Sequence, residues 1–289
     1  MGIAKQRKKV VFIGTGAMGY GMASQIMSKG YDLACIANKN RAPIDALLRH
    51  GATEAKTFAE LIDGRSVIIL CLPNSDVVKT VISQLSPYLQ PDMSVIDMGT
   101  SKPSASKEID GKLRKIMVNF LEAPVTGGVA QARSGDLGAL VGGSESLLKE
   151  MMPILKTMCR TIQYFGPVGS GNTAKLLNNY IVLGMVSLII EAFNGAKKAD
   201  IEWEKLYSVV KCGSADSMAL DRIIGNAVQG DFDGYVFSIK NALKDADYIH
   251  ELARSLDIDS SLPQVIQSFF SNAMKSGDPG ANISQLLKH

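Results

Sequence analysis

The chain has 289 residues, of which 46% are hydrophobic and 20% charged, a composition typical of a soluble globular protein with room for two hydrophobic cores. Its formal net charge of +3 is too small to indicate nucleic acid as a partner. The four cysteines have no metal-binding or redox spacing, and the three histidines do not pair as ligands, so we expect no metal site. Buried, reduced thiols in a cytoplasmic protein are the simplest interpretation.

Residues 10–22 combine a short apolar run, a glycine-rich turn and the start of a helix. In such a turn the first glycine allows the tight bend, the second lets the backbone approach a pyrophosphate, and the third lets the helix pack against its strand. This context predicts a dinucleotide-binding site, with an ordinary strand–turn–helix corner as the alternative. The residues expected to bind the cofactor here are Gly14, Thr15, Gly16, Ala17, Met18 and Gly19.

The first half of the chain alternates between strand-like and helix-like stretches. The expected strands cover residues 10–13, 33–37, 67–72, 94–97 and 116–121. The helices between them cover residues 18–28, 43–49, 75–85 and 103–113, and a strand–helix–strand series follows over 137–141, 144–158 and 161–165. This alternation predicts right-handed crossovers and a parallel sheet covered on both faces.

At residue 166 the alternation stops, and the sequence beyond it is typical of helices. We therefore predict an α/β Rossmann-type dinucleotide-binding domain over residues 1–166, followed by an all-helical domain for substrate binding and oligomerisation over 167–289. The stretch 172–199 is apolar on nearly every side, which predicts a helix buried all round and favours a homodimer or homotetramer. Its most apolar part, 180–190, is too short to span a membrane, so we expect no membrane partner.

Three polar residues share one face of this long helix, namely Asn172, Lys175 and Asn179. Burial lowers the pKa of a lysine, so a buried Lys175 could pass a proton at working pH. Asn179, one turn further on, could then hold a substrate hydroxyl or carbonyl. The alternative is that Lys175 extends from the first turn of the helix into solvent, and spacing alone favours neither.

Two loops could bind anions. Thr126, Gly127 and Gly128 follow an expected strand, and a Gly-Gly turn there could cradle a carboxylate or could simply connect two elements. Asn38, Lys39 and Arg41 follow the second expected strand, where NAD-preferring proteins usually have an acidic residue that binds the ribose. Because basic residues can instead bind a 2′-phosphate, we predict NADP(H) as the preferred cofactor, with NAD(H) possible. An exposed basic loop is the alternative.

Taken together, these segments resemble the β-hydroxyacid dehydrogenase family, and the match runs in order over nearly the whole chain. The matching segments are the fingerprint 14–22, Leu72-Pro73-Asn74, the turn 97–100, the turn 123–128, Gly135-Asp136-Leu137 with Gly142-Gly143, the helix start 169–179, and Phe237 through Lys244-Asp245. Several separate motifs in the same order make this resemblance specific.

The resemblance implies a role for each matching residue. Lys175 matches the catalytic lysine, and Asn179 matches the asparagine that orients the substrate. The residues that match substrate-binding positions are Thr126, Gly127, Gly128, Phe237 and Asp245. Further matches to cofactor-binding positions are Leu72, Pro73, Thr100 and Lys244.

Three positions depart from the family pattern. Thr126 stands where the family more often has serine, which would make the substrate pocket smaller by a methyl group. Gly99 replaces a usual serine, so a hydrogen bond from that side chain is missing. Lys240 has no counterpart in the pattern, and either an additional anion contact or a solvated surface position would account for it.

The resemblance implies an NAD(P)-dependent oxidoreductase that reversibly reduces a small carboxylate-bearing aldehyde, such as a semialdehyde or glyoxylate, to the hydroxy acid. Lys175 would be its general acid and base. An imine reductase-like enzyme and a non-catalytic cofactor-binding module on the same fold are the alternatives. Imine reductases usually carry Asp or Tyr at the lysine position, and non-catalytic relatives tend to lose the lysine, so Lys175 argues against both.

Overall fold

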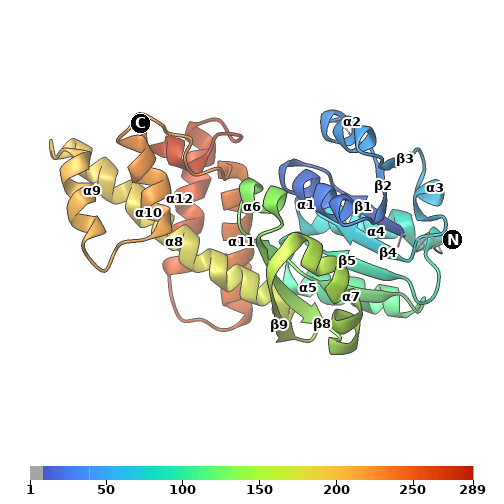
Figure 1. Cartoon of the computed structure of the whole chain (residues 1–289). Coiled ribbons are helices and arrows are strands. Elements are labelled where there is room, and N and C mark those ends of the chain that lie inside the picture. The colour runs from blue at the N-terminus through green and yellow to red at the C-terminus, as the bar shows by residue number, and fades with distance from the viewer. Residues whose placement is uncertain (1–8, 39, 289) are drawn as a thin grey trace. The chain divides into compact units, whose positions relative to one another are not determined.

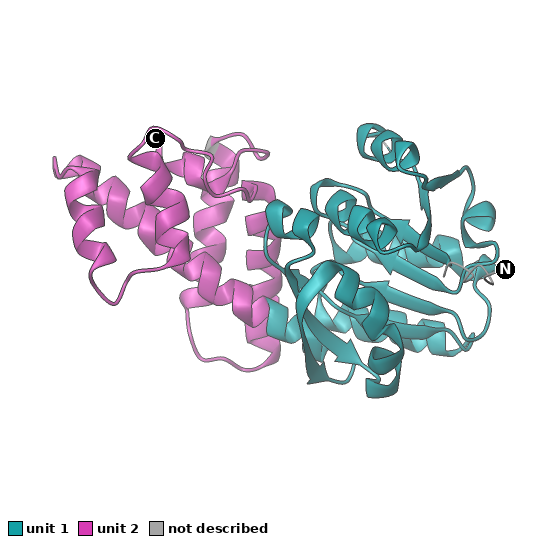
Figure 2. Ribbon diagram, viewed as in Figure 1, with its two compact units in different colours: residues 1–175 teal, residues 176–289 magenta. Residues whose placement is uncertain are grey.

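A computed structural model describes residues 9–38 and 40–288 of the chain (Figure 1). The chain divides into two compact units, Met1–Lys175 and Leu176–His289 (Figure 2). The predicted boundary at residue 166 coincides with the end of the last strand, whereas the division between the units falls within the helix that follows.

The described part of the first unit contains one nine-stranded sheet with the order β3-β2-β1-β4-β5-β6-β8-β7, and β9 pairs with β8. The strands are β1 (Lys9–Ile13), β2 (Asp32–Ile36), β3 (Thr53–Ala55), β4 (Val67–Leu70), β5 (Ser94–Asp97), β6 (Asn119–Glu122), β7 (Val125–Thr126), β8 (Leu137–Gly143) and β9 (Cys159–Gly166). From β3 to β6 all neighbours are parallel, in the strand order of a dinucleotide-binding fold.

The prediction of a wholly parallel sheet is wrong beyond β6, because β8 runs antiparallel to both β6 and β7. The reason is the content of the connection. A parallel return needs a crossover of a dozen or more residues that usually contains a full helix. Part of the connection between β6 and β8, residues 123–136, is used by β7, which pairs antiparallel with β8, and its helix α6 (Val129–Ser134) has only six residues. From β8 to β9 the longer helix α7 (Glu145–Met158) restores parallel pairing.

Helices cover both faces of this sheet, as the alternation predicted (Figure 1). Val10 and Phe12 of β1 pack in a cluster with α1 (Ala17–Ser28), α2 (Ala42–Arg49), α6 and α7. The intervening residues Val11 and Ile13 pack in a second cluster with α3 (Phe58–Ile62), α4 (Ser75–Leu85) and α5 (Pro103–Arg114). A short 3₁₀ turn, η1 (Ser86–Tyr88), follows α4. Successive side chains of each strand thus enter opposite cores.

The second unit is helical, as predicted. Its elements are α8 (Ser170–Lys198), which begins in the first unit, α9 (Trp203–Lys211), α10 (Met218–Leu220), the π-helical turn η2 (Asp221–Gly225), α11 (Ile239–Ser255), α12 (Leu262–Ser276) and η3 (Ile283–Leu287). The apolar face of α8 forms one cluster with residues of α11 and α12, and Trp203 joins it by donating a hydrogen bond to the Phe193 carbonyl at 2.8 Å.

The prediction that the long helix is buried all round is wrong. Leu183, Val186 and Ile190 are buried on one side of α8, but Ile181 and Leu188 on other sides are 65% and 66% exposed. Only one side of α8 packs against other helices of its unit. By length and composition α8 could also cross a membrane, in contrast to the expectation from residues 180–190, but core helices of soluble proteins share these properties.

Candidate active site

The glycine-rich turn after β1 has the geometry that a dinucleotide requires. Gly14 has a φ of +98°, and a Cβ atom there would overlap with the carbonyl oxygen of Cys71 on the neighbouring chain segment. A Cβ atom on Gly19 would overlap with the Gly14 carbonyl, so the helix approaches the turn closely. At Gly16, by contrast, a Cβ atom would meet nothing within 4 Å. The second glycine therefore faces open space over the turn.

The N-terminus of α1 is available to an anion. Gly16 is its N-cap residue, no side chain caps it among the described residues, and its first turn has no acidic residue. Gly16 and Ala17 are exposed, whereas Thr15 and Met18 are half-buried. Unsatisfied amides and the positive end of the helix dipole suit a pyrophosphate. The residues present thus fit the phosphates of a nicotinamide dinucleotide.

The turns after β4 and β5 lie beside this fingerprint. The Cys71 amide donates to the Ile13 carbonyl at 2.9 Å, which brings Leu72 and the exposed Pro73 next to the end of β1. A Cβ atom on Gly99 would lie 2.9 Å from the Leu72 carbonyl oxygen. This close approach explains why glycine replaces the usual serine there. Thr100, which follows, is half-buried.

The basic loop after β2 is only partly described, since Lys39 lies outside the described residues. Asn38 is exposed. The guanidinium of Arg41 forms hydrogen bonds of 2.8 and 3.0 Å to the Glu54 carboxylate and one of 3.0 Å to Asp45. The hydrogen bonds from Arg41 hold the pKa of Glu54 below its ordinary value. Arg41 is therefore near the expected ribose site but is already paired with acidic residues.

The Thr126–Gly128 turn joins β7 to α6. Thr126 and Gly127 are exposed, and the Gly128 amide donates to the side-chain oxygen of Gln131 at 2.9 Å. α6 packs closely against α1, because a Cβ atom on Gly21 would lie 2.8 Å from the Ala132 backbone. The turn thus leads into a helix that contacts the fingerprint helix. Thr126 and Gly127 are thus accessible as residues, whereas the Gly128 amide is already used.

Lys175 is buried, with 8% of its surface exposed, so it does not extend into bulk solvent. Asn172 and Glu122, near the start of the same helix, are completely buried. One carboxylate oxygen of Glu122 accepts hydrogen bonds from the amides of Gly169, Gly171 and Asn172 at 2.7, 2.8 and 3.2 Å. The carboxylate thereby caps the helix that carries Lys175.

In the second unit the structure brings three of the expected site residues together. The Asn179 amide donates to Asp245 Oδ2 at 2.7 Å, and the Lys244 ammonium lies 2.8 Å from Asp245 Oδ1. Lys244 Nζ also lies 5.3 Å from the centre of the Tyr248 ring. Asp245 is only 3% exposed. The carboxylate of Asp245 therefore orients Asn179 directly.

Two further residues flank this group along the chain. Phe237 is half-buried against the helical core, just before Ser238 caps α11 by accepting a hydrogen bond from Asn241. Lys240 is exposed on the first turn of α11, as a solvated surface residue would be.

Sequence reasoning missed the buried polar residues behind the expected site. The signal was present, because Asp97 and Glu122 each end an apolar strand with a carboxylate, and the two strands pair in register. Both side chains are completely buried. A charged residue at the carboxyl end of a buried strand should have been assigned a partner or a function.

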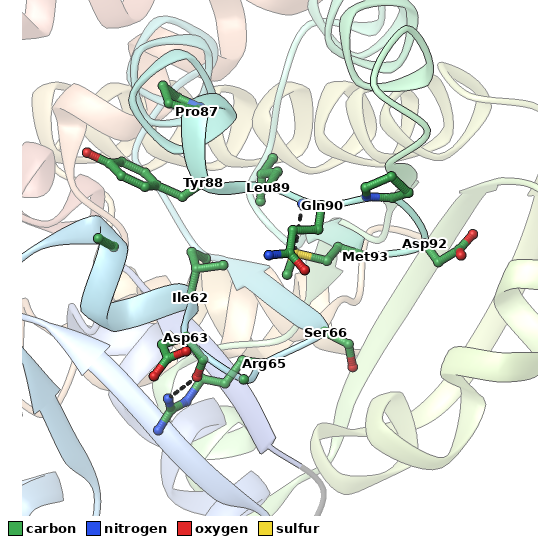
Figure 3. Close-up of a pocket in the computed structure, with 13 residues that line it drawn as sticks. Ile62, Asp63, Arg65, Ser66, Pro87, Tyr88, Leu89, Gln90, Asp92 and Met93 are labelled. Atoms are coloured by element: carbon green, nitrogen blue, oxygen red, sulfur yellow. Dashed lines mark hydrogen bonds between the residues drawn. The ribbon is translucent and has the colours of Figure 1, made fainter.

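A cavity of about 660 Å³ lies elsewhere in the first unit, lined mainly by the segments 62–66 and 87–93 (Figure 3). Arg65 beside it donates a hydrogen bond to the Asp63 carbonyl at 3.0 Å. These segments directly precede β4 and β5, so the cavity lies at the amino ends of the strands. Dinucleotides bind at the carboxyl ends, and this cavity is therefore not the cofactor site.

Comparisons with known proteins cover the whole described chain. A model of the NAD-binding domain of 6-phosphogluconate dehydrogenase matches residues 9–166, and a model described as NAD-binding of NADP-dependent 3-hydroxyisobutyrate dehydrogenase matches residues 169–289. An NAD-dependent L-serine dehydrogenase of Pseudomonas aeruginosa is 27% identical and covers 97% of each chain. A probable 3-hydroxyisobutyrate dehydrogenase-like protein of Arabidopsis thaliana is 30% identical over 78% of this chain and 71% of its own length.

Among solved structures, the 3-hydroxyisobutyrate dehydrogenase of Mycobacterium tuberculosis with L-serine superposes with a TM-score of 0.88. It is 22% identical and covers 98% of this chain and 99% of its own. This likeness establishes the fold of both units.

Proposed function

The chain belongs to the β-hydroxyacid dehydrogenase family and is an NAD(P)-dependent oxidoreductase acting on CH–OH groups, and from that premise we propose its reaction. The enzyme reversibly reduces a small carboxylate-bearing aldehyde to the corresponding hydroxy acid. Lys175 is its general acid and base, and NADP(H) is its preferred cofactor. The observation that carries the proposal is the burial of Lys175 on a capped helix, because lysine is rarely buried and buried ionisable groups cluster at functional sites.

In the reduction, Lys175 donates a proton to the carbonyl oxygen of the substrate, and in the oxidation it accepts the proton of the hydroxyl group. The nicotinamide, when bound, supplies the hydride to, or accepts it from, the substrate carbon that bears this oxygen. Asn179 lies one turn further along α8, and its amide is held by Asp245. With one amide proton committed to Asp245, Asn179 keeps its second for the substrate oxygen.

Recognition of the substrate carboxylate is assigned to the Thr126–Gly128 turn. Thr126 and Gly127 are exposed there, and the hydrogen bond from Gly128 to Gln131 holds the shape of the turn. A hydroxyl and backbone amides bind a carboxylate without adding a positive charge.

The preference for NADP(H) rests on the loop after β2. The described residues between Asp32 and Asp45 include no acidic side chain, and Arg41 is 53% exposed, so it can bind a 2′-phosphate if it leaves Glu54. Phosphate offers the guanidinium the same bidentate geometry as the carboxylate that it gives up. One relative is described as NAD-dependent and one matching model as NADP-dependent, so cofactor choice varies among similar proteins.

The exposed apolar side of α8 supports a further proposal, that the protein assembles as a homodimer or homotetramer. Ile181, Leu188 and Val265 of α12 are each more than half exposed. The two helices are neighbours at this point, because a Cβ atom built on Gly184 would be in ordinary van der Waals contact with the Ile266 side chain. Exposed apolar side chains on adjacent helices are typical of an interface between subunits.

The experiment that tests the reaction is a panel assay of the purified protein at the nicotinamide absorbance band. The aldehydes are glyoxylate, succinic, tartronate and methylmalonate semialdehydes and a sulfonated aldehyde, and L-serine and 3-hydroxyisobutyrate are assayed in the oxidative direction. We expect NADPH-linked turnover with at least one carboxylate-bearing compound and little with an uncharged aldehyde of similar size, which is added as a control. Absence of turnover with every compound and both cofactors would contradict the proposed reaction, and a tenfold preference for NADH would contradict the cofactor assignment.

A further inference from the structure

A buried network of polar side chains lies directly behind the start of α8. Glu122 ends β6, and its Oε1 atom accepts three backbone amide hydrogen bonds from the residues that begin the helix. Its Oε2 atom accepts a fourth hydrogen bond, of 2.8 Å, from the Asn172 side chain. The carboxylate is completely buried, so these donors are what compensate for its desolvation.

Asn172 connects this carboxylate to the neighbouring strand end. Its side-chain oxygen accepts the Ser101 amide at 2.8 Å, and its side-chain nitrogen donates both to Glu122 and to Ser106 Oγ at 3.1 Å. The described contacts therefore use both protons of the Asn172 amide and its oxygen. The orientation of the amide is fixed, because a flip would place its nitrogen against the Ser101 amide and its oxygen against the Glu122 carboxylate.

The network continues to the turn that follows β5. Ser101 Oγ donates to Asp97 Oδ2 at 2.9 Å, and the Gly99 amide donates to Asp97 Oδ1 at 3.0 Å. Thr100, which the family resemblance assigns to cofactor binding, lies between Gly99 and Ser101 in the chain. A continuous set of buried hydrogen bonds thus links the Thr100 turn to the first turn of α8, three residues before Lys175.

We propose that Glu122 and Asn172 are positioning residues. They hold Lys175 at a fixed position relative to the Thr100 turn, so that the group that transfers the proton and the cofactor that transfers the hydride are correctly placed at the same time. The inference rests on the proposed role of Lys175. Neither residue contacts the reacting atoms. Their effect comes through α8, because Glu122 fixes where the helix starts and Asn172 fixes its distance from the β5 turn. Misplacement of a catalytic group by about 1 Å can cost roughly a hundredfold in rate.

The pair can be tested by exchanging the two side-chain groups. In Glu122→Gln the new amide nitrogen faces the Asn172 amide nitrogen, and in Asn172→Asp two carboxylates face each other at the present 2.8 Å contact. The double variant Glu122→Gln/Asn172→Asp restores a donor opposite an acceptor. In this variant the amide oxygen at position 122 still accepts the backbone amides, and the carboxylate at position 172 can accept from Ser101 and Ser106.

Three measurements are made on the full-length protein, namely kcat, the dissociation constant of the cofactor, and amide hydrogen exchange of the segment 169–176 without substrate. We expect each single variant to lower kcat by about tenfold or more and to speed exchange in this segment, with the cofactor dissociation constant changed by less than about threefold. The double variant should recover most of the rate and the protection. The matched control is Thr157→Val, which removes a buried hydroxyl whose only described hydrogen bond is to Ile154, and it should leave kcat unchanged.

Two results would overturn the inference. In one, the single variants speed exchange but keep native kcat. In the other, the double variant regains protection from exchange but not kcat. If a single variant does not fold, Ser106→Ala removes one partner of Asn172 alone, and an unchanged kcat and unchanged exchange in that variant would equally overturn it. Failure of the proposed function is distinguishable, because the native protein would then show no turnover while the exchange measurements, which need no substrate, still report on the network.

Discussion

Lys175 has only 8% of its residue surface exposed and lies in the second turn of a helix whose start is capped by a buried carboxylate. Most lysines on a helix surface are solvated, whereas Lys175 is buried. Burial of a charged group costs several kcal/mol unless other groups compensate, and buried ionisable groups cluster at functional sites, which supports the proposed proton-transfer role.

Replacing Lys175 tests its role in proton transfer separately from any role in folding or cofactor binding. Lys175→Ala should lower kcat by about a thousandfold while the cofactor still binds, because only the proton donor is lost. Added primary amines such as methylamine should restore part of the activity, since the space left by the side chain can admit them. Lys175→Arg is the control that keeps the charge but does not release a proton at neutral pH. Near-normal turnover of Lys175→Ala would contradict the assignment.

The proposed preference for NADP(H) depends, at the residue scale, on the pair Arg41 and Glu54. Glu54 occupies the guanidinium through two hydrogen bonds, so it competes with a 2′-phosphate. Arg41→Ala should weaken NADPH binding by about tenfold and leave NADH binding within about twofold, because only NADPH has the phosphate. Glu54→Gln should strengthen NADPH binding severalfold by freeing Arg41. Titrations of both cofactors with both variants measure this, and equal effects on NADH and NADPH would mean that Arg41 is simply a surface ion pair.

At the scale of elements, the turn between β1 and α1 offers two glycines that differ in what surrounds them. Gly14 has positive φ and a crowded Cβ position, whereas Gly16 has an ordinary extended backbone and open space. We therefore expect the first glycine to matter for folding and the second for binding of the cofactor.

This contrast predicts opposite effects for two alanine substitutions. Gly14→Ala should lower Tm by roughly 4 °C or more, because the left-handed conformation alone costs about 1–2 kcal/mol and the crowding adds to it. Gly16→Ala should leave Tm unchanged but raise the cofactor dissociation constant by about tenfold or more, since its methyl group fills the space where phosphates approach. Thermal unfolding and cofactor titration of both variants test the contrast. Unchanged cofactor affinity in Gly16→Ala would place the dinucleotide elsewhere.

At the scale of the whole molecule, the exposed apolar side of α8 predicts self-association. Ile181→Glu combined with Leu188→Glu should convert the oligomer to monomers, because charges would be buried at an apolar contact. Val209→Glu on α9, where valine is 70% exposed, is the matched control and should leave the oligomer intact. Light scattering during size-exclusion chromatography measures the mass. A mass that corresponds to a monomer for the native protein would contradict the proposed self-association.

The cysteines provide a second test of the whole fold. The expectation that all four are buried is wrong for Cys212, which is exposed, whereas Cys35 and Cys159 are buried and Cys71 is half-buried. Burial raises the pKa of Cys35 to about 11 and those of Cys71 and Cys159 to about 12, so these thiols remain protonated near pH 8. We expect one fast-reacting thiol per native chain in a thiol titration and four after unfolding. Substituting Cys212 with Ser should remove the fast phase.

Local sequence predicted the elements that form from short-range patterns. The glycine fingerprint, the alternation of strands and helices up to β5 and the helical second unit all follow from periodicity and turn residues. Short elements such as β3, β7, α3 and α6 were missed, because a few residues carry too little periodic signal. The antiparallel return of β8 was missed because it depends on the short strand β7 and the lack of a full crossover helix before β8, which the pattern of apolar residues does not encode.

By itself, the order of residues determined the fold class, the dinucleotide turn and the identity of the lysine, since each depends on a few neighbours along the chain. Only the tertiary structure decided that Lys175 is buried, that Arg41 is paired with Glu54, and that Glu122 and Asn172 join two strand ends to one helix. Burial and hydrogen bonding between residues 50 apart in the chain depend on which strands become neighbours, and that is settled by packing of the complete sheet.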